Sequence, residues 1–274
     1  MIGPEGILGI VGHPVAHSLS PALHNWALAG NGLPKAYFRW DIRPERLVDF
    51  VAAVRTLGIK GVSVTIPHKV EMMDLVDEVT DEARAVGAVN TLFWKDDALV
   101  GGNTDVFGFL APLKLGGRMP TSALVLGVGG AARAVVFGLR REGAEVLVAG
   151  RDRRRAEKFA RMTGTRAVDW QERGQVQAQL LVNATPLGMS GAQEAMSPWP
   201  CGLVGFEAVY DLVYNPVQTV LLNQARAEGR VVFSGLDMFV HQAQAQFRLW
   251  TGREFGEDQA RVFLHGLLAR MTRP

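Results

Sequence analysis

Residues 123–132, Ala-Leu-Val-Leu-Gly-Val-Gly-Gly-Ala-Ala, decide the fold of this chain. The first four are apolar, as in a parallel strand that is buried on both faces. The next six fit the pattern G-x-G-x-x-A, and a helix is expected from about Ala131 to Arg141. Such a turn lets backbone N–H groups approach a pyrophosphate closely, although a tight structural turn is the alternative. We predict an α/β dinucleotide-binding domain whose cofactor lies against Gly127, Gly129, Gly130 and Ala131.

The end of the next predicted strand, residues 145–149, indicates which dinucleotide is bound. Gly150 and then Arg151, Asp152 and three more arginines follow it. Sites specific for NAD place an acidic residue here for the ribose 2′-hydroxyl, whereas this chain places an arginine first. Cations at a helix N-terminus oppose the helix dipole, so the cluster favours an anionic ligand over a solvated basic helix start. We predict NADPH or NADP⁺ as the cofactor, with Asp152 as the N-cap of the next helix.

Strands and helices also alternate before the glycine-rich turn, which indicates a second, parallel α/β layer. Apolar residues at helical spacing predict a helix from Pro44, with its apolar face formed by Leu47, Phe50, Val51, Val54 and Leu57. The other elements expected in this region are strands over 7–11 and 37–42 and from 61, helices over 21–29, from 69 to 76, 81–86 and 106–113, and a hairpin over 91–94 and 98–101.

The stretch GVSVTIPHK, residues 61–69, joins a strand to a candidate catalytic residue. Pro67 is expected to stop the strand, because proline donates no ladder hydrogen bond. Lys69 follows directly, at a place where a strand end can hold a side chain over a cleft. A lysine there can donate a proton if its surroundings lower its pKa, and a solvated surface lysine is the alternative.

The loop before the first predicted helix contains two hydroxyls. Ser20 precedes Pro21 and is expected to be the helix N-cap, while Ser18 has no such structural role. Two hydroxyls at the positive end of a helix can bind a carboxylate, and a simple turn is the alternative. His13, His17, His24 and His68 lack acidic or cysteine partners at ligand spacing, so no metal site is expected.

The rest of the chain continues the pattern of the glycine-rich region. The turn Asn183–Met189 follows a predicted strand, at the sheet edge where open α/β folds bind ligands. Residues 190–205 contain several Gly and Pro residues and are expected to form a mobile loop. The remaining predicted elements are strands over 179–182, 208–212 and 231–234, a helix from 217, and helices over 237–250 and 257–269.

Composition limits the possible functions. The chain has 274 residues, enough for two domains, with 48% hydrophobic and 20% charged residues. A dispersed net charge of +2 gives no reason to expect a nucleic-acid partner. Cys201 is the only cysteine, and neither a signal peptide nor an 18-residue apolar stretch is visible. We expect a cytoplasmic enzyme that acts on a small-molecule substrate and has no membrane partner. The sequence leaves open whether it is a monomer or a homodimer.

Taken together, nine blocks in sequence resemble the shikimate dehydrogenase family. They extend over nearly the whole chain, in the order in which the family carries them. The blocks are GHPVAHSLSPALHN (12–25), GVSVTIPHK (61–69), GAVNTL (87–92), GGNTD (101–105), GVGGAARA (127–134), GRDRRRA (150–156), NATPLGM (183–189), YDLVYNP (210–216) and GLDMFVHQAQAQF (235–247).

The resemblance implies NADPH-dependent reduction of 3-dehydroshikimate to shikimate, a step towards chorismate and the aromatic amino acids. It also implies an α/β substrate domain (residues 1–105 and 241–274) and a Rossmann-like, doubly wound NADP domain (106–240). Lys69 and Asp105 would be the catalytic pair. Ser18 and Ser20 would bind the substrate carboxylate near Tyr214, and its hydroxyls would be held by Thr65, Asn90, Asp105 and Gln242. The cofactor would be bound by Gly127, Gly129, Gly130, Ala131, Arg151, Arg155, Thr185 and Gly235.

Two positions depart from the commonest pattern of the family. Ser63 and Gly150 each stand where many members have Asn. Asp152 keeps open an NAD-preferring quinate/shikimate dehydrogenase, because an acidic residue in this loop can favour NAD. A non-catalytic NADP-sensing module is a further alternative, although it would have no need of Lys69 and Asp105.

Overall fold

The computed structural model describes residues 3–271, which fall into two compact units. The first unit runs to Thr104 and resumes at Gln242, and the second unit is Asp105–His241. Each boundary lies one residue from the predicted one. The chain passes between the units twice, at the start of one helix and within another.

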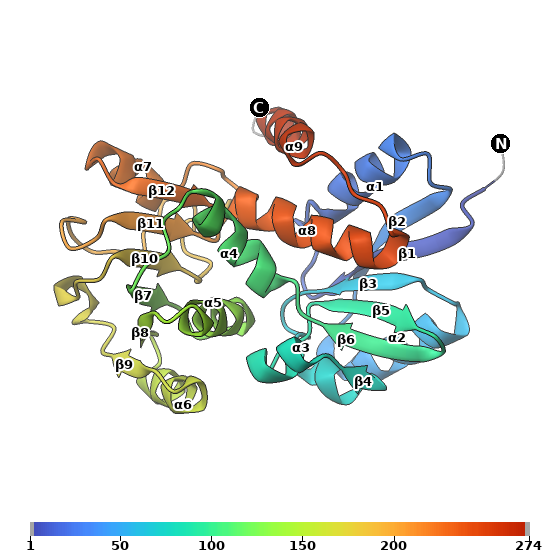
Figure 1. Ribbon diagram of the computed structural model, residues 1–274, viewed down its shortest axis with the longest axis horizontal. Coiled ribbons are helices and arrows are strands. Elements are labelled where there is room, and N and C mark those ends of the chain that lie inside the picture. Colours follow the sequence, from blue (N-terminus) through green and yellow to red (C-terminus); the bar gives the residue numbers. More distant parts are fainter. Residues whose placement is uncertain (1–2, 272–274) are drawn as a thin grey trace. The chain divides into compact units, whose positions relative to one another are not determined.

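The first unit contains a mixed six-stranded sheet with the order β2-β1-β3-β5-β6-β4 (Figure 1). Strand β1 pairs in parallel with β2 and β3, whereas β5 pairs antiparallel with both β3 and β6. A purely parallel layer is therefore wrong for this unit, because the predicted hairpin joins the sheet itself. The strands are β1 (Gly6–Gly12), β2 (Lys35–Asp41), β3 (Gly61–Val64), β4 (Glu78–Val79), β5 (Thr91–Lys95) and β6 (Ala98–Gly102).

Helix α2 (Leu47–Thr56) covers one face of this sheet, and four of its five predicted apolar residues are buried against β1, β3 and β5. The fifth, Leu57, lies beyond the helix end and is 66% exposed, so its assignment to the apolar face is wrong. Helix α1 (Ser20–Gly30) and the part of α8 (Gly235–Thr251) from Gln242 onward contact the other face. The unit also contains α3 (Asp81–Val86), α9 (Glu257–Met271) and the short 3-10 helices η1 (Pro44–Arg46) and η2 (Glu71–Asp74).

Two local predictions in the first unit are wrong. Ser20 is the first helical residue rather than the N-cap, and the hydroxyl of Ser18 accepts its N–H at 3.2 Å. The strand before Lys69 ends at Val64, and only the 3-10 helix η2 follows, not an α-helix to Val76. Its backbone bonds span three residues, as from Leu75 N–H to Met72 C=O, which is the tighter pattern of a 3-10 turn.

The second unit contains a six-stranded, fully parallel sheet with the order β12-β11-β10-β7-β8-β9. Counted from the first strand of the unit, this is the order 6-5-4-1-2-3 of a doubly wound Rossmann fold. The strands are β7 (Ser122–Leu126), β8 (Glu145–Ala149), β9 (Arg166–Val168), β10 (Leu180–Asn183), β11 (Ala208–Asp211) and β12 (Val231–Ser234). Strand β9, which has only three residues, had not been predicted from the sequence.

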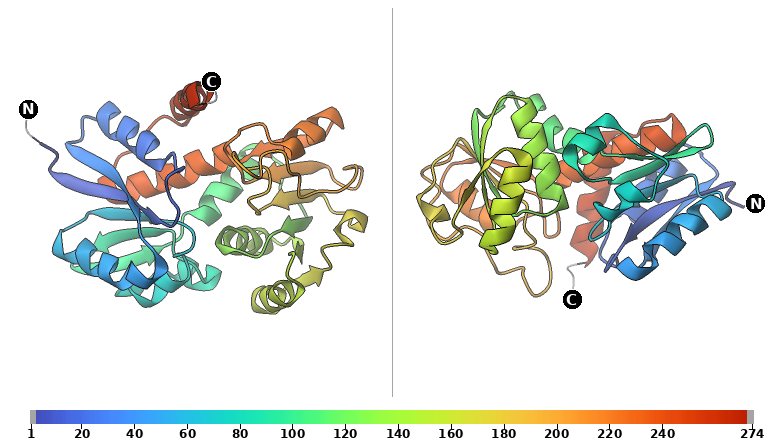
Figure 2. Two further views of the ribbon diagram at one scale, coloured as in Figure 1. Left: turned by 180° about the vertical axis from the view of Figure 1, so that it is seen from behind. Right: turned by 90° about the horizontal axis from the view of Figure 1, so that it is seen from below.

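The helices of this unit are α4 (Asp105–Leu115), α5 (Gly130–Arg141), α6 (Arg153–Thr163), α7 (Val220–Ala227), the 3-10 helix η3 (Arg173–Gln175) and the first part of α8. Helices α5 and α6 lie side by side (Figure 2). Helix α7 begins three residues later than predicted, because the hydroxyl of Thr219 caps it by accepting the Leu222 N–H at 3.2 Å.

Residues 190–205 form neither helix nor strand, but the second half of this segment packs into the core of the second unit. Trp199 and Leu203 are buried in the core of the second unit with Leu124, Leu126 and Val209. The predicted loop therefore contributes to the core instead of lying wholly at the surface.

Candidate active site

Two predicted substrate residues of the first unit, Thr65 and Asn90, lie at one edge of its sheet together with Thr104. Thr65 follows the end of β3, and Asn90 precedes β5, which runs antiparallel to β3. Thr104 follows the end of β6, which again runs in the direction of β3. The local topology therefore places all three at the edge where β1 and β3 end.

Asn90 is buried, and its backbone and side chain are both held firmly. Its C=O accepts the Val64 N–H at 2.7 Å, and its N–H bonds to Gly102 C=O at 2.9 Å. The side-chain oxygen accepts the Thr104 N–H at 2.7 Å, and the Nδ2 group donates to Thr104 Oγ1 at 3.0 Å. Since the donor and acceptor sides of the amide cannot exchange without breaking both bonds, Asn90 has one orientation.

Thr65 and Lys69 are half-buried in the turn after β3. The Thr65 N–H bonds to Val11 C=O at 2.9 Å, and the Lys69 C=O accepts the Val89 N–H at 2.7 Å. The turn is therefore joined at both ends to neighbouring parts of the unit, and its backbone can hold the lysine at a defined place.

The other predicted substrate residues lie on helices or in a loop. Ser18 and Ser20 lie at the N-terminus of α1, Ser20 buried and Ser18 half-buried. Gln242 is the residue of α8 with which the first unit resumes, and Asp105 is the buried first residue of α4. Tyr214 is half-buried in the second unit and stacks on Phe239, with ring centroids 4.9 Å apart.

The glycine-rich turn of the second unit has the backbone that a phosphate site needs. Gly127 has φ +111, and a Cβ on it would lie 2.7 Å from the Ala184 carbonyl oxygen. The fold itself therefore requires glycine at this position. Gly129 is different, because a Cβ there would meet no atom within 4 Å. It is the N-cap of α5, and no side chain caps the N-terminus of that helix. Free N–H groups, an open space and a helix N-terminus together fit an anionic group such as a pyrophosphate.

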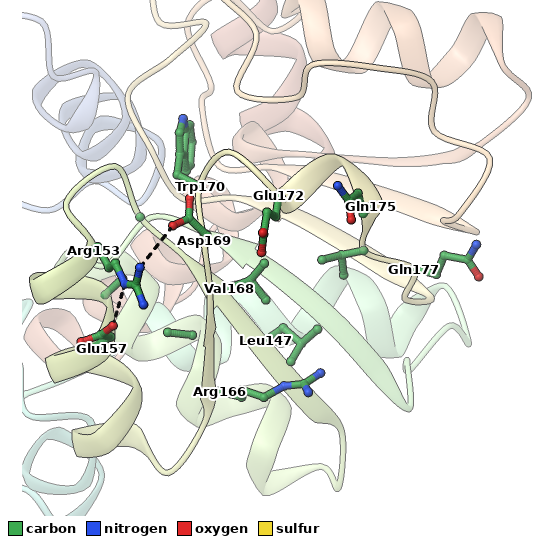
Figure 3. Close-up of a pocket in the computed structure, with 14 residues that line it drawn as sticks. Leu147, Arg153, Glu157, Arg166, Val168, Asp169, Trp170, Glu172, Gln175 and Gln177 are labelled. Carbon is green, nitrogen blue, oxygen red and sulfur yellow. Dashed lines mark hydrogen bonds and ion pairs between the residues drawn. The ribbon is translucent and has the colours of Figure 1, made fainter.

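The arginine cluster after β8 divides into two kinds. Arg153 donates to Glu157 at 2.9 Å and lies 4.0 Å from Asp169 (Figure 3). Arg151, Arg154 and Arg155 are exposed, and none of them forms an ion pair with another residue of the range 3–271. Three uncompensated positive charges at the start of α6 fit a phosphate better than a hydroxyl.

Asp152, in the same loop, has a structural role as a helix cap. Its side chain accepts the Arg155 N–H at 3.0 Å, so it caps α6 as predicted. A hollow of about 660 Å³ beside this loop is lined by Gly150 and Arg153 and, among others, by Trp170 and Gln177 (Figure 3). Cationic and anionic side chains are mixed along it, so its lining does not by itself select a ligand.

Thr185 lies just after the end of β10, and Gly235 directly follows β12, two strands further along the same sheet. Both the N–H and the hydroxyl of Thr185 donate to Asn183 Oδ1, at 3.0 and 2.6 Å. Gly235 begins α8 directly after β12, and a Cβ there would lie 2.3 Å from Leu212 C=O. Only glycine permits this close approach of the two chain segments.

Sequence reasoning missed several polar residues that organise the site. Asn183 and Asp211 end two neighbouring buried strands, and polar residues at the ends of such apolar runs are a signal that could have been used. Tyr37 and Gln246 are buried within the first unit and join the residues around Asn90 by hydrogen bonds. No local pattern in the sequence connects these two residues.

Within residues 3–271, no group of three or more His, Cys, Asp or Glu side chains could hold a metal ion. The same part of the chain contains no helix that is long and apolar enough to cross a membrane.

Comparison with known proteins identifies the family. The family model of the shikimate dehydrogenase substrate binding domain matches residues 10–92, and that of the shikimate 5′-dehydrogenase C-terminal domain matches residues 235–261. The chain is 47% identical to a shikimate dehydrogenase (NADP(+)) of Oleidesulfovibrio alaskensis, over 97% of both chains. It is 44% identical to that of Maridesulfovibrio salexigens, over 95% of this chain and 97% of the relative.

A solved structure shares the whole fold. Shikimate 5-dehydrogenase of Thermus thermophilus, crystallised with NADP(H) and shikimate, is 42% identical and superposes with a TM-score of 0.85. The match covers 95% of this chain and 99% of that one. With full-length relatives at this level of identity, the chain belongs to the shikimate dehydrogenase family.

Proposed function

We propose that this protein catalyses the reversible, NADPH-dependent reduction of 3-dehydroshikimate to shikimate, a step towards chorismate and the aromatic amino acids. The observation that carries the proposal is the 47% identity over 97% of both chains to a shikimate dehydrogenase (NADP(+)). A relationship of that extent spans both units, which supports a substrate site in the first unit and a cofactor site in the second.

The first unit supplies the substrate groups in this proposal. Ser18 and Ser20 bind the carboxylate at the N-terminus of α1, where the helix dipole also favours an anion. Thr65, Asn90 and Gln242 bind the ring hydroxyls. The fixed orientation of the Asn90 amide supports this role, because a prearranged donor loses little freedom when it binds.

The second unit supplies the cofactor groups. The turn Gly127–Ala131 and the N-terminus of α5 hold the pyrophosphate, and Arg151 and Arg155 hold the 2′-phosphate. The open space at Gly129 and the unpaired charges of these arginines support that assignment. Since Asp152 is already engaged as the cap of α6, the structure gives no added reason to prefer NAD.

Lys69 and Asp105 carry the proton chemistry in this scheme. When bound, NADPH supplies the hydride for the substrate ketone. Lys69 stabilises the developing alkoxide and donates its proton, and Asp105 orients the lysine and shares a substrate hydroxyl. General acid–base catalysis of this kind contributes about 10²- to 10⁴-fold to the rate.

Steady-state kinetics with two substrates and two cofactors test the function. We expect turnover of shikimate with NADP⁺ to exceed turnover of quinate, and NADP⁺ to be preferred over NAD⁺. A preference for NAD⁺ or quinate would instead assign the protein to the quinate/shikimate branch. Binding of NADPH without turnover of either substrate would indicate a sensing module.

The variant Lys69→Ala tests the chemistry. Its kcat should fall at least about 100-fold with little change in KM, because only transition-state stabilisation is lost. Lys60→Ala, at an exposed lysine just before β3, is the matched control and should keep its kcat. An unchanged kcat in Lys69→Ala would remove this residue from the mechanism.

A further inference from the structure

A connected line of buried polar side chains crosses the first unit beneath the residues assigned to the substrate. Tyr37 on β2 donates to Ser63 Oγ on β3 at 2.7 Å. Ser63 in turn donates to Gln246 Oε1 on α8 at 2.8 Å. The Nε2 group of Gln246 donates to Thr91 Oγ1 at 2.9 Å, and the Thr91 hydroxyl donates to Asn90 Oδ1 at 2.7 Å. Four hydrogen bonds thus join an edge-strand tyrosine to the amide of Asn90.

Backbone groups fix the direction of every bond in this line. The Nε2 group of Gln246 also donates to the Asn90 C=O at 3.1 Å, and a carbonyl can only accept. Gln246 must therefore turn its oxygen towards Ser63, which has to donate to it and accept from Tyr37. At the other end, the Thr104 N–H requires Asn90 to present its oxygen. Reversing any one hydroxyl would place two donors or two acceptors face to face.

The starting residue of the line is itself rigidly placed. Tyr37 is 3% exposed, and its ring stacks on His24 with the centroids 4.4 Å apart and the planes at 11°. Both the N–H and the C=O of Tyr37 bond to the Asn25 side chain, each at 2.9 Å. A hydroxyl on a fixed ring can hold Ser63 in one rotamer, whereas water cannot replace it in so buried a place.

We propose that Tyr37 is a positioning residue for the substrate, acting through Ser63, Gln246 and Thr91 on the amide of Asn90. The proposal rests on the proposed function, because that function assigns Asn90 to a substrate hydroxyl. Without the tyrosine hydroxyl, Ser63 loses its only donor in this line and can turn away from Gln246. The Gln246 side chain is then held only through its Nε2 group. The Thr91 hydroxyl that donates to Asn90 Oδ1 is less firmly placed as a result, and the bonds with Thr104 are the ones that still orient the Asn90 amide.

The test compares Tyr37→Phe with the wild-type protein. We expect KM for shikimate to rise about 3- to 10-fold, the effect of one lost hydrogen bond, while KM for NADP⁺ stays within about twofold. Calorimetric titration with shikimate, in the absence of cofactor, should give the same rise in Kd. Tyr210→Phe is the matched control, because it also removes a buried tyrosine hydroxyl, and that hydroxyl has no hydrogen-bond partner among residues 3–271. Its KM and Kd values should not change.

A second pair of variants separates positioning from a merely structural role. Ser63→Ala breaks the next link, so it should raise the shikimate KM by a similar factor. The double variant Tyr37→Phe/Ser63→Ala should then be no worse than the single variants, because both interrupt the same line. Additive effects, an unchanged shikimate KM, or equal losses for shikimate and NADP⁺ would each overturn the proposal. Wild-type protein that fails to oxidise shikimate would instead overturn the proposed function.

Discussion

The side-chain amide of Asn183 donates a hydrogen bond of 2.8 Å to the carboxylate of Asp211, and this pair joins the ends of strands β10 and β11. Asp211 is fully buried, and it also accepts the Val213 N–H at 3.0 Å and the Thr219 hydroxyl at 2.7 Å. Asn183 holds Thr185 with its remaining oxygen. One buried carboxylate therefore organises the turn that contains Thr185, the loop leading to Tyr214 and the start of α7.

The burial of Asp211 predicts a specific dependence of stability on pH. Burial raises the pKa of this carboxyl from 3.8 to about 6, although its hydrogen bonds with Thr219, Val213 and Asn183 act in the opposite direction. Between these pKa values the folded protein keeps the proton, while the unfolded chain has lost it. The stabilising contribution of the proton is therefore greatest at acidic pH and is lost as the pH rises to about 6.

The variant Asp211→Asn measures this contribution, because its amide cannot ionise. We expect the free energy of unfolding of the wild type, relative to the variant, to fall by about 2 kcal/mol between about pH 4.5 and pH 7. Urea unfolding at both pH values gives the difference. A difference that does not change with pH would show that Asp211 titrates normally in the folded protein.

His24 predicts a dependence of the opposite sign. It is fully buried, and within the described part of the chain neither ring nitrogen has a partner of good hydrogen-bond geometry. Burial lowers its pKa from 6.5 to about 3, with the nearby Gln246 side chain opposing this shift. The unfolded chain takes up a proton below 6.5, whereas the folded protein does not. Stability is therefore lost as the pH falls from about 6.5 towards 3.

We expect His24→Phe, which keeps a ring against Tyr37, to lose about 3 kcal/mol less stability than the wild type between about pH 6.5 and pH 4. His265→Phe, at an exposed histidine on α9, is the control and should follow the wild type. If His24→Phe also loses stability as steeply as the wild type, the folded protein protonates His24 at pH 4 as readily as the unfolded chain does.

The second unit could be predicted nearly element by element, because each longer strand is an apolar run that stops at a turn residue. Strand β9 could not be predicted, because its three residues, Arg166–Val168, are too few to show a strand pattern of apolar residues. Ser20 is expected to be the N-cap because the pair Ser-Pro fits that position, whereas Leu19 is the N-cap and Ser20 is the first helical residue. Ser63 and Gln246 are 183 residues apart, and only the packing of α8 on the sheet brings them together.

Alanine substitutions at two glycines of the same turn should affect different properties, stability at Gly127 and cofactor affinity at Gly129. Gly127→Ala should lower the free energy of unfolding by about 1–3 kcal/mol, because alanine must adopt φ +111 and approach the Ala184 carbonyl. Gly129→Ala should fold with nearly unchanged stability, since its Cβ would have no atom of residues 3–271 within 4 Å. Its affinity for NADPH should nevertheless fall at least about tenfold, because the methyl group occupies the space of the pyrophosphate. Unaltered binding in folded Gly129→Ala would place the pyrophosphate elsewhere.

Two neighbouring arginines, finally, test the cofactor preference with a control built into the same loop. Arg151→Ala removes an exposed charge that no described residue neutralises, so KM for NADP⁺ should rise about tenfold or more. KM for NAD⁺ should barely change, because NAD⁺ has no 2′-phosphate to lose a contact. Arg153→Ala removes a charge already paired with Glu157 and Asp169, and it should leave both KM values unchanged. Equal rises for NADP⁺ and NAD⁺ in Arg151→Ala would mean that this arginine contacts a part that both cofactors share, and the 2′-phosphate would then need another partner.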